Sequence, residues 1–442
     1  MQHLSAVFLD DGLGDQAPAR FLERRKVLAK TLSSPLVLAG MNRDASHLGA
    51  WVQADQAIIQ EPLFLALTGI NQLGSALVIL PGQPHQEILY LPKPNPQKAF
   101  WDGVQLTVAN GHSTGFTDIR PISQLSGDLR QLANTHAGLT TAWQASSKNK
   151  PFKDESYRFY QTLKAQVKPY PVAQLGKAQW DRLCLDAADQ ANIQTANTVS
   201  AQALKTLLSK LQTFETETQV AGHLKGELLS RSAYGESFPA IVAGGANATI
   251  LHYRKNDEPL PPKGLLLLDF GAKWYGLHAD ISRTVPVSGR FNPLQRLVYT
   301  LVLQAQAAVE ASAKPGISIA ELNHIAWSTL NTLLDTHIRK AGGKIHTVYQ
   351  QQPHNVSHLI GHQIHDGDPF REYRSQPLKA GMVISNEPGF YGRVQLEIEG
   401  VAYDEELGIR IEDGLLITPT GCKNLSVEAP KDPDELEALI QG

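Results

Sequence analysis

Four carboxylates stand inside or at the ends of apolar runs, where a charge is costly to bury. Asp269 and Asp280 lie in LLLLDFGAKWYGLHADISRTV, Glu387 lies in VISNEPGFY, and Glu412 lies in GIRIEDGLLI. An isolated buried carboxylate is strongly destabilising, so each needs a cationic partner or a metal ion. One alternative for the aspartates is a position in a turn with a salt bridge to Arg283.

A dense histidine cluster precedes the two glutamates. The segment HNVSHLIGHQIHD contains His354, His358, His362 and His365. A single histidine is more often buried and hydrogen-bonded, but four of them beside apolar residues favour metal ligation or proton transfer. The spacing of His354 and His358 matches a helical zinc motif, yet the intervening glutamate of that motif is absent. Because Gly361 also argues against a long helix, we reject this motif.

The donor types in these segments favour a metal site. Surface strand charges beside a basic residue such as Arg410 are the alternative for Glu387 and Glu412, but lysine and arginine are scarce there. Carboxylate oxygens with one imidazole suit divalent ions, with Mn²⁺ the leading candidate and Co²⁺, Fe²⁺ or Zn²⁺ possible. We therefore expect a site for two divalent metal ions.

Local patterns indicate how these residues are positioned. Asp269 ends an apolar run of strand length, and Gly271 and Gly276 supply a turn before the run that contains Asp280. Two adjacent antiparallel strands would bring the two carboxylates together.

Helices and further strands are expected around this hairpin. Helical patterns run between about residues 180 and 232, and the stretches FPAIVAGG and ATILHY read as strands. Asn292-Pro293 predicts the start of a helix that ends before Pro315-Gly316. Ser318 and Glu321 predict a capping box for the next helix, which stops at Gly342-Gly343. Helices grouped around antiparallel strands indicate an α+β domain.

The N-terminal part reads as a smaller mixed α/β domain. A helical stretch covers about residues 21–32, and β-type runs begin near Pro35, Leu63, Ser75 and Glu87. A charged, proline-dotted stretch places the boundary between residues 150 and 175. We expect an N-terminal domain at 1–172 and a catalytic domain at 173–442, in keeping with the usual two domains for 442 residues.

Composition excludes several classes of protein. The net charge is −3 and no strongly basic run occurs, which argues against nucleic acid and anionic membranes as partners. No stretch approaches the roughly 18 apolar residues of a membrane span, and the N-terminus lacks a signal-peptide pattern. The 2 cysteines lie far apart and favour a reducing compartment. We expect a cytoplasmic protein, in which the sequons at Asn247 and Asn424 are chance matches.

Taken together, these motifs resemble a known family. Across about residues 175–430, the chain resembles the metal-dependent pita-bread peptidases in the order of its motifs. These motifs are DFG with the aspartate that follows it, HxxxH, HD, EPG and GIRIED. That group includes aminopeptidase P, prolidase and methionine aminopeptidase. The resemblance implies a C-terminal pita-bread domain. It also implies five metal ligands, of which Asp280 and Glu412 bridge two ions, Asp269 binds one, and His358 and Glu387 bind the other.

The resemblance assigns further residues to the substrate. His354 and His365 would hold and polarise the scissile peptide, and Glu387 would shuttle a proton. His252 would also lie at the site, and Arg410 would support the substrate end of the pocket. Phe238 stands where aminopeptidase P often has tyrosine, and Asn355 stands where members usually have glycine. Both departures bear on fine specificity. His278 and His362 have no counterpart and are expected to be structural.

The N-terminal half narrows the expected activity. Its TG run, paired apolar strand and later W-x-G resemble the creatinase-like domain of aminopeptidase P, which methionine aminopeptidases lack. The resemblance implies an Xaa-Pro aminopeptidase acting on proline-containing peptides, as a homodimer or homotetramer. Prolidase, an Xaa-Pro dipeptidase, is the close alternative. A catalytically inactive peptide-binding module is a third hypothesis, which the five intact ligands disfavour.

Overall fold

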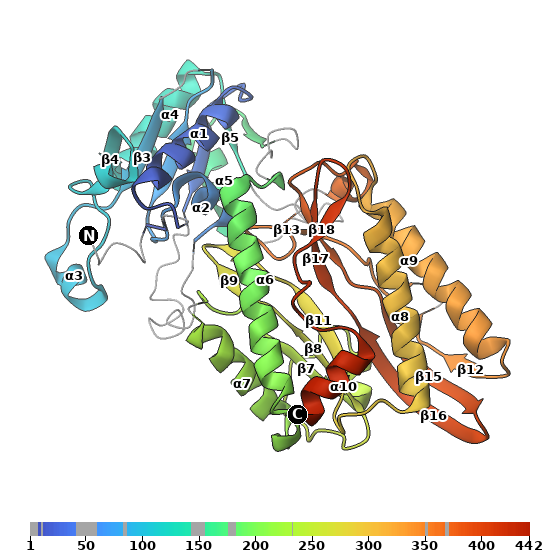
Figure 1. The fold of residues 1–442 in the computed structure, drawn as a ribbon. Helices are drawn as coiled ribbons and strands as arrows, with labels where there is room; N and C mark the ends of the chain where they lie inside the picture. Colours follow the sequence, from blue (N-terminus) through green and yellow to red (C-terminus); the bar gives the residue numbers. More distant parts are fainter. Residues whose placement is uncertain are drawn as a thin grey trace. The chain divides into compact units, whose positions relative to one another are not determined.

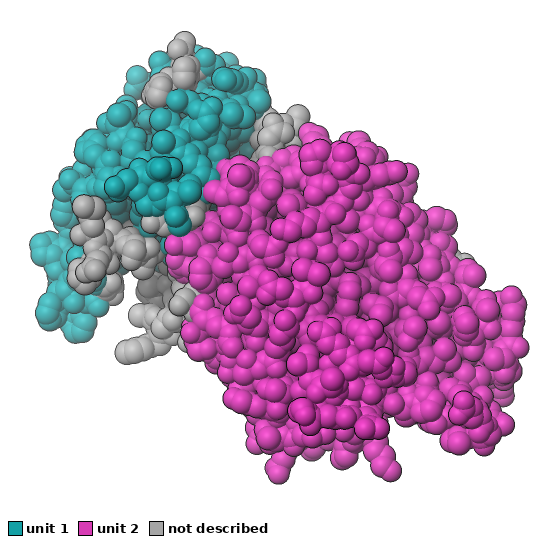
Figure 2. All heavy atoms as spheres, in the orientation of Figure 1, with its two compact units in different colours: residues 1–182, 368–371 teal, residues 183–367, 372–442 magenta. Residues whose placement is uncertain are grey.

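The chain divides into two compact units. The computed structural model describes residues 8–9, 12–40, 60–82, 86–142, 155–175, 183–231, 233–349, 352–366 and 371–442. Unit 1 comprises Met1–Arg182 with Asp368–Arg371, and unit 2 comprises Leu183–Gly367 with Glu372–Gly442 (Figure 2). Residue 172, the expected end of the N-terminal domain, lies in the last strand of unit 1.

Unit 1 is built on one mixed six-stranded sheet in the order β4-β3-β2-β1-β5-β6. The pairs β1-β2 and β2-β3 are antiparallel, whereas β3-β4, β1-β5 and β5-β6 are parallel. Its strands are β1 (Leu36–Ala39), β2 (Ala76–Ile79), β3 (Glu87–Leu91), β4 (Asp118–Pro121), β5 (Leu139–Thr141) and β6 (Val172–Gln174). Its helices are α1 (Ala17–Ala29), α2 (Pro62–Thr68), α3 (Pro96–Asp102), α4 (Leu125–Thr135) and α5 (Glu155–Gln166). The mixed α/β architecture expected for this half is confirmed.

One expected strand in unit 1 is wrong. The run LFLALTG forms helix α2 because Glu61 caps its first turn by accepting a hydrogen bond from the Phe64 amide. Pro62 occupies the first turn, and Gly69 ends the helix in the left-handed conformation. Leu63 through Thr68 are all buried, so the apolar residues surround the helix and leave no helical periodicity to read.

In its described residues, unit 2 combines four small sheets with helices on their flanks (Figure 1). The sheets are β11-β8-β7, β12-β15-β16, β13-β14-β17-β18 and the pair β10-β9. The first half contains α6 (Ala187–Leu208), α7 (Glu217–Ser230), β7 (Ile241–Gly244), β8 (Leu265–Phe270), β9 (Lys273–Trp274), β10 (Leu277–His278), β11 (Ile281–Pro286) and α8 (Pro293–Ser312). The second half contains α9 (Ile319–Leu334), β12 (Lys344–His346), β13 (Leu359–Ile360), β14 (Val383–Asn386), β15 (Gly389–Ile398), β16 (Val401–Arg410), β17 (Asp413–Ile417), β18 (Cys422–Asn424) and α10 (Pro433–Gln441).

The predicted helix starts in unit 2 are confirmed. Asn292 caps α8 and Ser318 caps α9, each within a capping box that also uses the residue three positions later. In Figure 1, α8 and α9 lie side by side, and α8 also contacts the long strands β15 and β16. Within the described residues, no helix is both long and apolar enough to cross a bilayer.

The expected strand at ATILHY is also wrong. After β7 the chain turns into a 3₁₀ helix at Gly245–Thr249, with Gly245 at φ +55°. This turn packs closely on β16, where a Cβ atom added at Gly408 would lie 2.2 Å from the backbone carbon of Ala248. Contact with a strand from much later in the chain therefore decides the local conformation.

A close backbone approach sets the hairpin between β8 and β11. A Cβ atom at Gly271 would lie 1.9 Å from the carbonyl oxygen of Ala279. We expect Gly271→Ala to lower the free energy of unfolding by about 1–3 kcal/mol, as overpacking typically does, and to weaken metal binding by displacing Asp280. Denaturant unfolding and a metal titration measure both effects. Gly226→Ala in α7, where an added Cβ meets nothing within 4 Å, is the control. Equal stability of the two variants would contradict the prediction.

Candidate active site

The hairpin positions the first two carboxylates as expected. Strands β8 and β11 are antiparallel, with Asp269 opposite Ser282, and Asp280 comes directly before β11. The Ala279 amide donates to the Ala272 carbonyl at 2.9 Å and closes the loop between them. Both carboxylates line the same pocket. The alternative partner Arg283 points elsewhere, because its guanidinium forms an ion pair with Asp413 at 2.7 Å.

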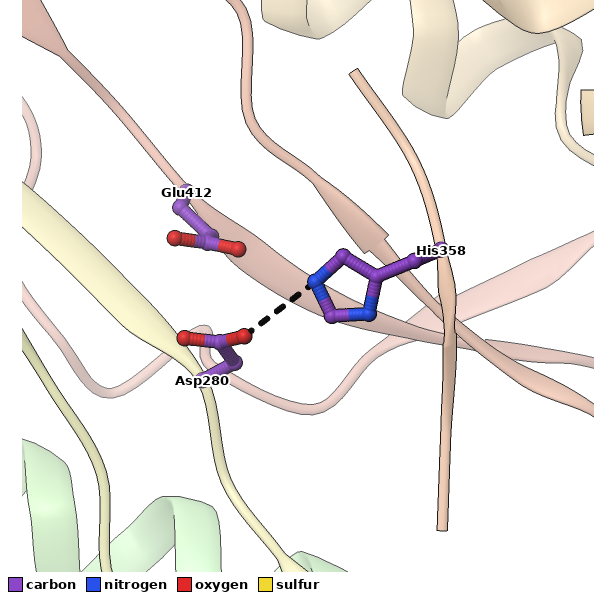
Figure 3. A group of neighbouring side chains, drawn as sticks. All are labelled: Asp280, His358 and Glu412. Atoms are coloured by element: carbon purple, nitrogen blue, oxygen red, sulfur yellow. Dashed lines mark ion pairs between the residues drawn. The ribbon is translucent and has the colours of Figure 1, made fainter. Parts of the chain in front are cut away.

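Asp280, His358 and Glu412 form a buried group of possible metal ligands. One potential ligand atom from each lies within 4.8 Å of the others. Figure 3 shows the three side chains pointing toward one another, with Asp280 Oδ2 3.3 Å from His358 Nε2. Ser282 Oγ donates to Glu412 Oε2 at 2.7 Å and orients that carboxylate. Asp280 directly precedes β11, His358 directly precedes β13, and Glu412 lies in the β16-β17 connection, so only the folded unit assembles them.

Glu387 extends this group. It follows β14, and its amide donates to the Val356 carbonyl at 2.9 Å, which ties it to the histidine segment. Its Oε1 lies 3.5 Å from His358 Nε2 and accepts a hydrogen bond from Ser385 Oγ at 3.3 Å. Ser385 Oγ also accepts from the His358 amide, so one serine positions both side chains.

Asp269 differs from the other carboxylates because it has a cationic partner. Arg410 donates to Asp269 Oδ2 at 2.6 Å. This partner comes from a distant segment, so the scarcity of lysine and arginine within the segments of the carboxylates did not reveal it. Asp269 Oδ1 is buried and has no hydrogen-bond partner among the described residues. An acceptor left in that state is free to bind a cation.

The electrostatics of the pocket fit divalent metal ions. Burial, followed by repulsion from neighbouring carboxylates, raises the pKa values of Asp280 and Glu412 well above their usual range. Burial also raises the pKa of Glu387 to about 7, partly opposed by Arg410. Several carboxylates held this close cannot all ionise without added positive charge. Divalent cations supply that charge, so the donor set fits them.

The affinity of the site for divalent metal should rise as the pH increases from about 6 to about 8, because bound metal displaces protons from its ligands. At the lower pH, the raised pKa leaves Glu387 protonated in the metal-free protein. Calorimetric titration with Mn²⁺ in two buffers of different ionisation enthalpy counts the released protons. Unchanged affinity and no proton release at the lower pH would contradict this expectation.

The expected substrate residues line the same pocket, which has a volume of about 360 Å³. They are Phe238, His252, His354, His365 and Arg410. His354 Nε2 lies 3.1 Å from the Tyr391 hydroxyl, and burial lowers the pKa of His354 to about 4, so its ring is neutral at pH 7. Partial burial, then the cations Arg410 and Arg254, lower the pKa of His252. The His365 ring lies against His358, with centroids 4.1 Å apart.

Sequence reasoning missed several residues of the pocket. Arg254 and Arg374 line the pocket. Tyr391 links His354 to Arg410, because its hydroxyl contacts His354 and also accepts from Arg410 Nη1 at 3.3 Å. Arg254 stands two positions after His252, and Tyr391 follows the EPG motif closely, so proximity to a motif was the available signal.

The two histidines expected to be structural do not line the pocket. His278 is buried in β10, and its amide donates to the Gly361 carbonyl at 3.1 Å. Burial, then nearby Lys273, lowers its pKa to about 3. The His362 amide donates to the Asp366 carboxylate at 2.9 Å.

Comparison with known protein families agrees with this fold and site. Residues 191–419 match metallopeptidase family M24, and residues 21–143 match the N-terminal domain of aminopeptidase P. The first match covers more than half of the chain, so the chain belongs to metallopeptidase family M24. The family recognised from the motifs, and the pita-bread fold expected with it, are confirmed.

Individual relatives cover both units. The Xaa-Pro aminopeptidase of Haemophilus influenzae is 28% identical over 86% of this chain and 88% of its own length. Intermediate cleaving peptidase 55 of Arabidopsis thaliana, named as mitochondrial, is 27% identical over 86% of this chain and 75% of its own. Among solved structures, proline aminopeptidase P II from Yersinia pestis superposes with a TM-score of 0.80 at 24% identity. That superposition covers 96% of this chain and 99% of the other, and it establishes the shared fold.

Proposed function

We propose that this protein is an Xaa-Pro aminopeptidase, a dinuclear-metal exopeptidase that hydrolyses the bond between an N-terminal residue and proline. The observation that carries the proposal is one pocket that gathers Asp269, Asp280, His358, Glu387 and Glu412. The chain also has the N-terminal domain of aminopeptidase P, and relatives that match along most of both units are named Xaa-Pro aminopeptidase.

The metal ligands are part of this proposal. Asp280 and Glu412 would each contact both ions, Asp269 would bind one, and His358 with Glu387 would bind the other. Bound divalent ions supply a nucleophile from water near neutral pH and polarise the scissile carbonyl. Mn²⁺ is the proposed native metal, with Co²⁺, Fe²⁺ and Zn²⁺ as alternatives. The cytoplasmic location and a homodimer or homotetramer stay predictions.

The residues of the chain itself supply proton transfer and substrate orientation. With a pKa of about 7, Glu387 is suited to accept a proton from the nucleophile and pass it to the leaving nitrogen of proline. His365 would donate a hydrogen bond to the scissile peptide. The neutral His354 ring donates from Nδ1 to the Asn355 carbonyl at 2.8 Å, so its Nε2 accepts from the Tyr391 hydroxyl at 3.1 Å, and its role would be to orient the groups that hold that peptide. An Xaa-Pro bond has no N–H to recognise, so the pocket must select the proline ring by shape. Phe238 provides an apolar wall for that purpose.

Peptide hydrolysis in the presence of Mn²⁺ tests the proposal. Xaa-Pro-Yaa tripeptides should be cleaved after the first residue, and matched Xaa-Ala-Yaa tripeptides should be cleaved far more slowly. Activity confined to Xaa-Pro dipeptides would favour prolidase instead. No cleavage together with no bound metal, and no effect of Glu387→Ala, would favour the inactive peptide-binding module. Equal cleavage of the alanine peptides would reject proline specificity while keeping the peptidase.

A further inference from the structure

Among the described residues, three arginines line the pocket, and two of them are engaged with neighbouring side chains. Arg410 is buried and donates to Asp269, Ser282 and Tyr391. The Arg374 guanidinium packs over the Tyr373 ring at 4.9 Å from its centroid. Arg254 is exposed, and among the described residues its guanidinium has no hydrogen-bond or ion-pair partner. It is therefore available to bind a group that enters the pocket.

The backbone on both sides of Arg254 is firmly anchored. Tyr253 is buried, and its hydroxyl donates to Glu217 Oε2 at 2.7 Å. Asn256 adopts a left-handed conformation at φ 50°. The side chain of Asn256 bridges two backbone groups beside β7, since it accepts from the Val242 amide at 2.9 Å and donates to the Ala240 carbonyl at 2.8 Å. The base of the Arg254 side chain is thus held in place, which lowers the entropy lost on binding a ligand.

The position of Arg254 relates it to one part of a bound peptide. The ligand group at Asp280 and Glu412 is buried, whereas Arg254 is exposed. Arg254 lies two residues after His252, and its positive charge contributes to the lowered pKa of the His252 ring. A peptide with its scissile bond at the buried group would extend outward past His252 and Arg254. The residue that follows proline would then lie beside the exposed Arg254 guanidinium in the pocket lining.

We infer that Arg254 is a specificity-determining residue that selects peptides with a carboxylate on the residue immediately after proline. A guanidinium pairs with a carboxylate through two parallel hydrogen bonds, and the carboxylate is the only negatively charged group common in unmodified peptides. The carboxylate comes either from the C-terminus of a tripeptide or from an Asp or Glu side chain in a longer peptide. This inference rests on the proposed function and adds a substrate class to it.

Three peptides with the same scissile bond distinguish the two sources of carboxylate. Ala-Pro-Ala-NH₂ has no carboxylate, Ala-Pro-Ala has the terminal one, and Ala-Pro-Glu-NH₂ has one on a side chain. For the Mn²⁺-loaded wild-type protein, kcat/KM should be about 5- to 10-fold higher for one or both carboxylate peptides than for Ala-Pro-Ala-NH₂. The difference should lie mainly in KM, because the pair of Arg254 and the carboxylate is present in both the ground state and the transition state. The preference should shrink as salt is added.

Variants of Arg254 connect this preference to one side chain. The quantity to compare is the ratio of kcat/KM for the carboxylate peptides to kcat/KM for the amide. Arg254→Gln should bring this ratio to about one, Arg254→Lys should keep part of the preference, and Arg254→Glu should invert it. Lys255→Gln removes the same charge from the adjacent exposed residue, which does not line the pocket, and should keep the wild-type ratio. An equal loss in both neutral variants would reduce the effect to net charge and overturn the inference.

Further outcomes would overturn the inference about Arg254, and they differ from the outcomes that would reject the proposed peptidase activity. An unchanged ratio in Arg254→Gln, or a wild-type preference for an acid at the first position in Glu-Pro-Ala-NH₂, rejects the inference. Cleavage of Ala-Pro-Ala-NH₂ by the wild type supports the proposed function in either case. No cleavage of any Xaa-Pro peptide by the metal-loaded wild type rejects both. Because the Arg254 side chain is exposed and has no hydrogen-bond or ion-pair partner in the part of the chain that the structure describes, thermal unfolding of its variants should match the wild type.

Discussion

Asp280→Ala is expected to prevent the binding of both metal ions and to lower kcat/KM by at least about 10³-fold. The magnitude follows because metal ions supply several kcal/mol of transition-state stabilisation, and each 1.4 kcal/mol is a factor of ten. Asp280 Oδ2 lies 3.3 Å from His358, in the buried group with Glu412. Asp269 is the proposed ligand of one ion alone, and it pairs with Arg410. Asp269→Ala should therefore lose mainly one ion.

Elemental analysis of purified protein, together with calorimetric titration, measures this asymmetry. The exposed Asp257, which does not line the pocket, provides the matched control, and Asp257→Ala should keep the full metal content. Identical metal content in the Asp269 and Asp280 variants would contradict the different roles proposed for these two ligands.

Arg283→Ala should lower the free energy of unfolding by about 3–5 kcal/mol, the usual cost of removing one partner from a buried ion pair. Arg283 is fully buried and pairs with Asp413, which is also fully buried. Its other donors bind the carbonyl oxygens of Ser282, Glu412, Ala429 and Pro430. The substitution removes this donor from the Glu412, Ala429 and Pro430 carbonyls and from the Asp413 carboxylate. The Ser282 carbonyl still accepts from the Glu412 amide at 3.0 Å, and Lys431 still contacts Asp413.

Denaturant unfolding in the presence of a chelator isolates this effect from metal binding. The control is Arg290→Ala, an exposed position between β11 and α8. This substitution should change the free energy of unfolding by less than about 0.5 kcal/mol. A similarly small change for Arg283→Ala would show that the buried pair contributes little net stability. In the metal-loaded protein, the same substitution should also weaken metal binding, because Arg283 holds the backbone of Glu412.

Features encoded by neighbouring residues were predictable from the sequence. The capping residues Asn292 and Ser318 act within one turn of helix, and their motifs therefore give the right starts for α8 and α9. The β8-β11 hairpin was also predictable, because Gly271 allows the close approach of its two strands.

Features that depend on distant contacts were not predictable. The pairing of Arg410 with Asp269 joins β16 to β8, and nothing near either residue indicates it. Likewise, the turn at Gly245–Thr249 depends on contact with Gly408, and α2 is buried on all sides. The candidate metal ligands could be predicted from the sequence because metal binding requires particular residue types, whichever helices and strands carry them. The availability of Arg254, in contrast, only became evident once the partners of the other arginines were known.

The hydrogen bonds of Arg283 to Ala429 and Pro430 have a consequence for synthesis of the protein on the ribosome. Every proposed metal ligand is present in a nascent chain that has been translated through Glu412. Arg283, which holds the Glu412 backbone, still lacks two of its carbonyl partners at that stage. The hydrogen-bond network that holds the Glu412 backbone is therefore complete only after residues 429–430 have left the exit tunnel. Nascent chains stalled earlier should therefore contain all the ligands and yet capture metal poorly, which delays activity until translation of this segment is complete.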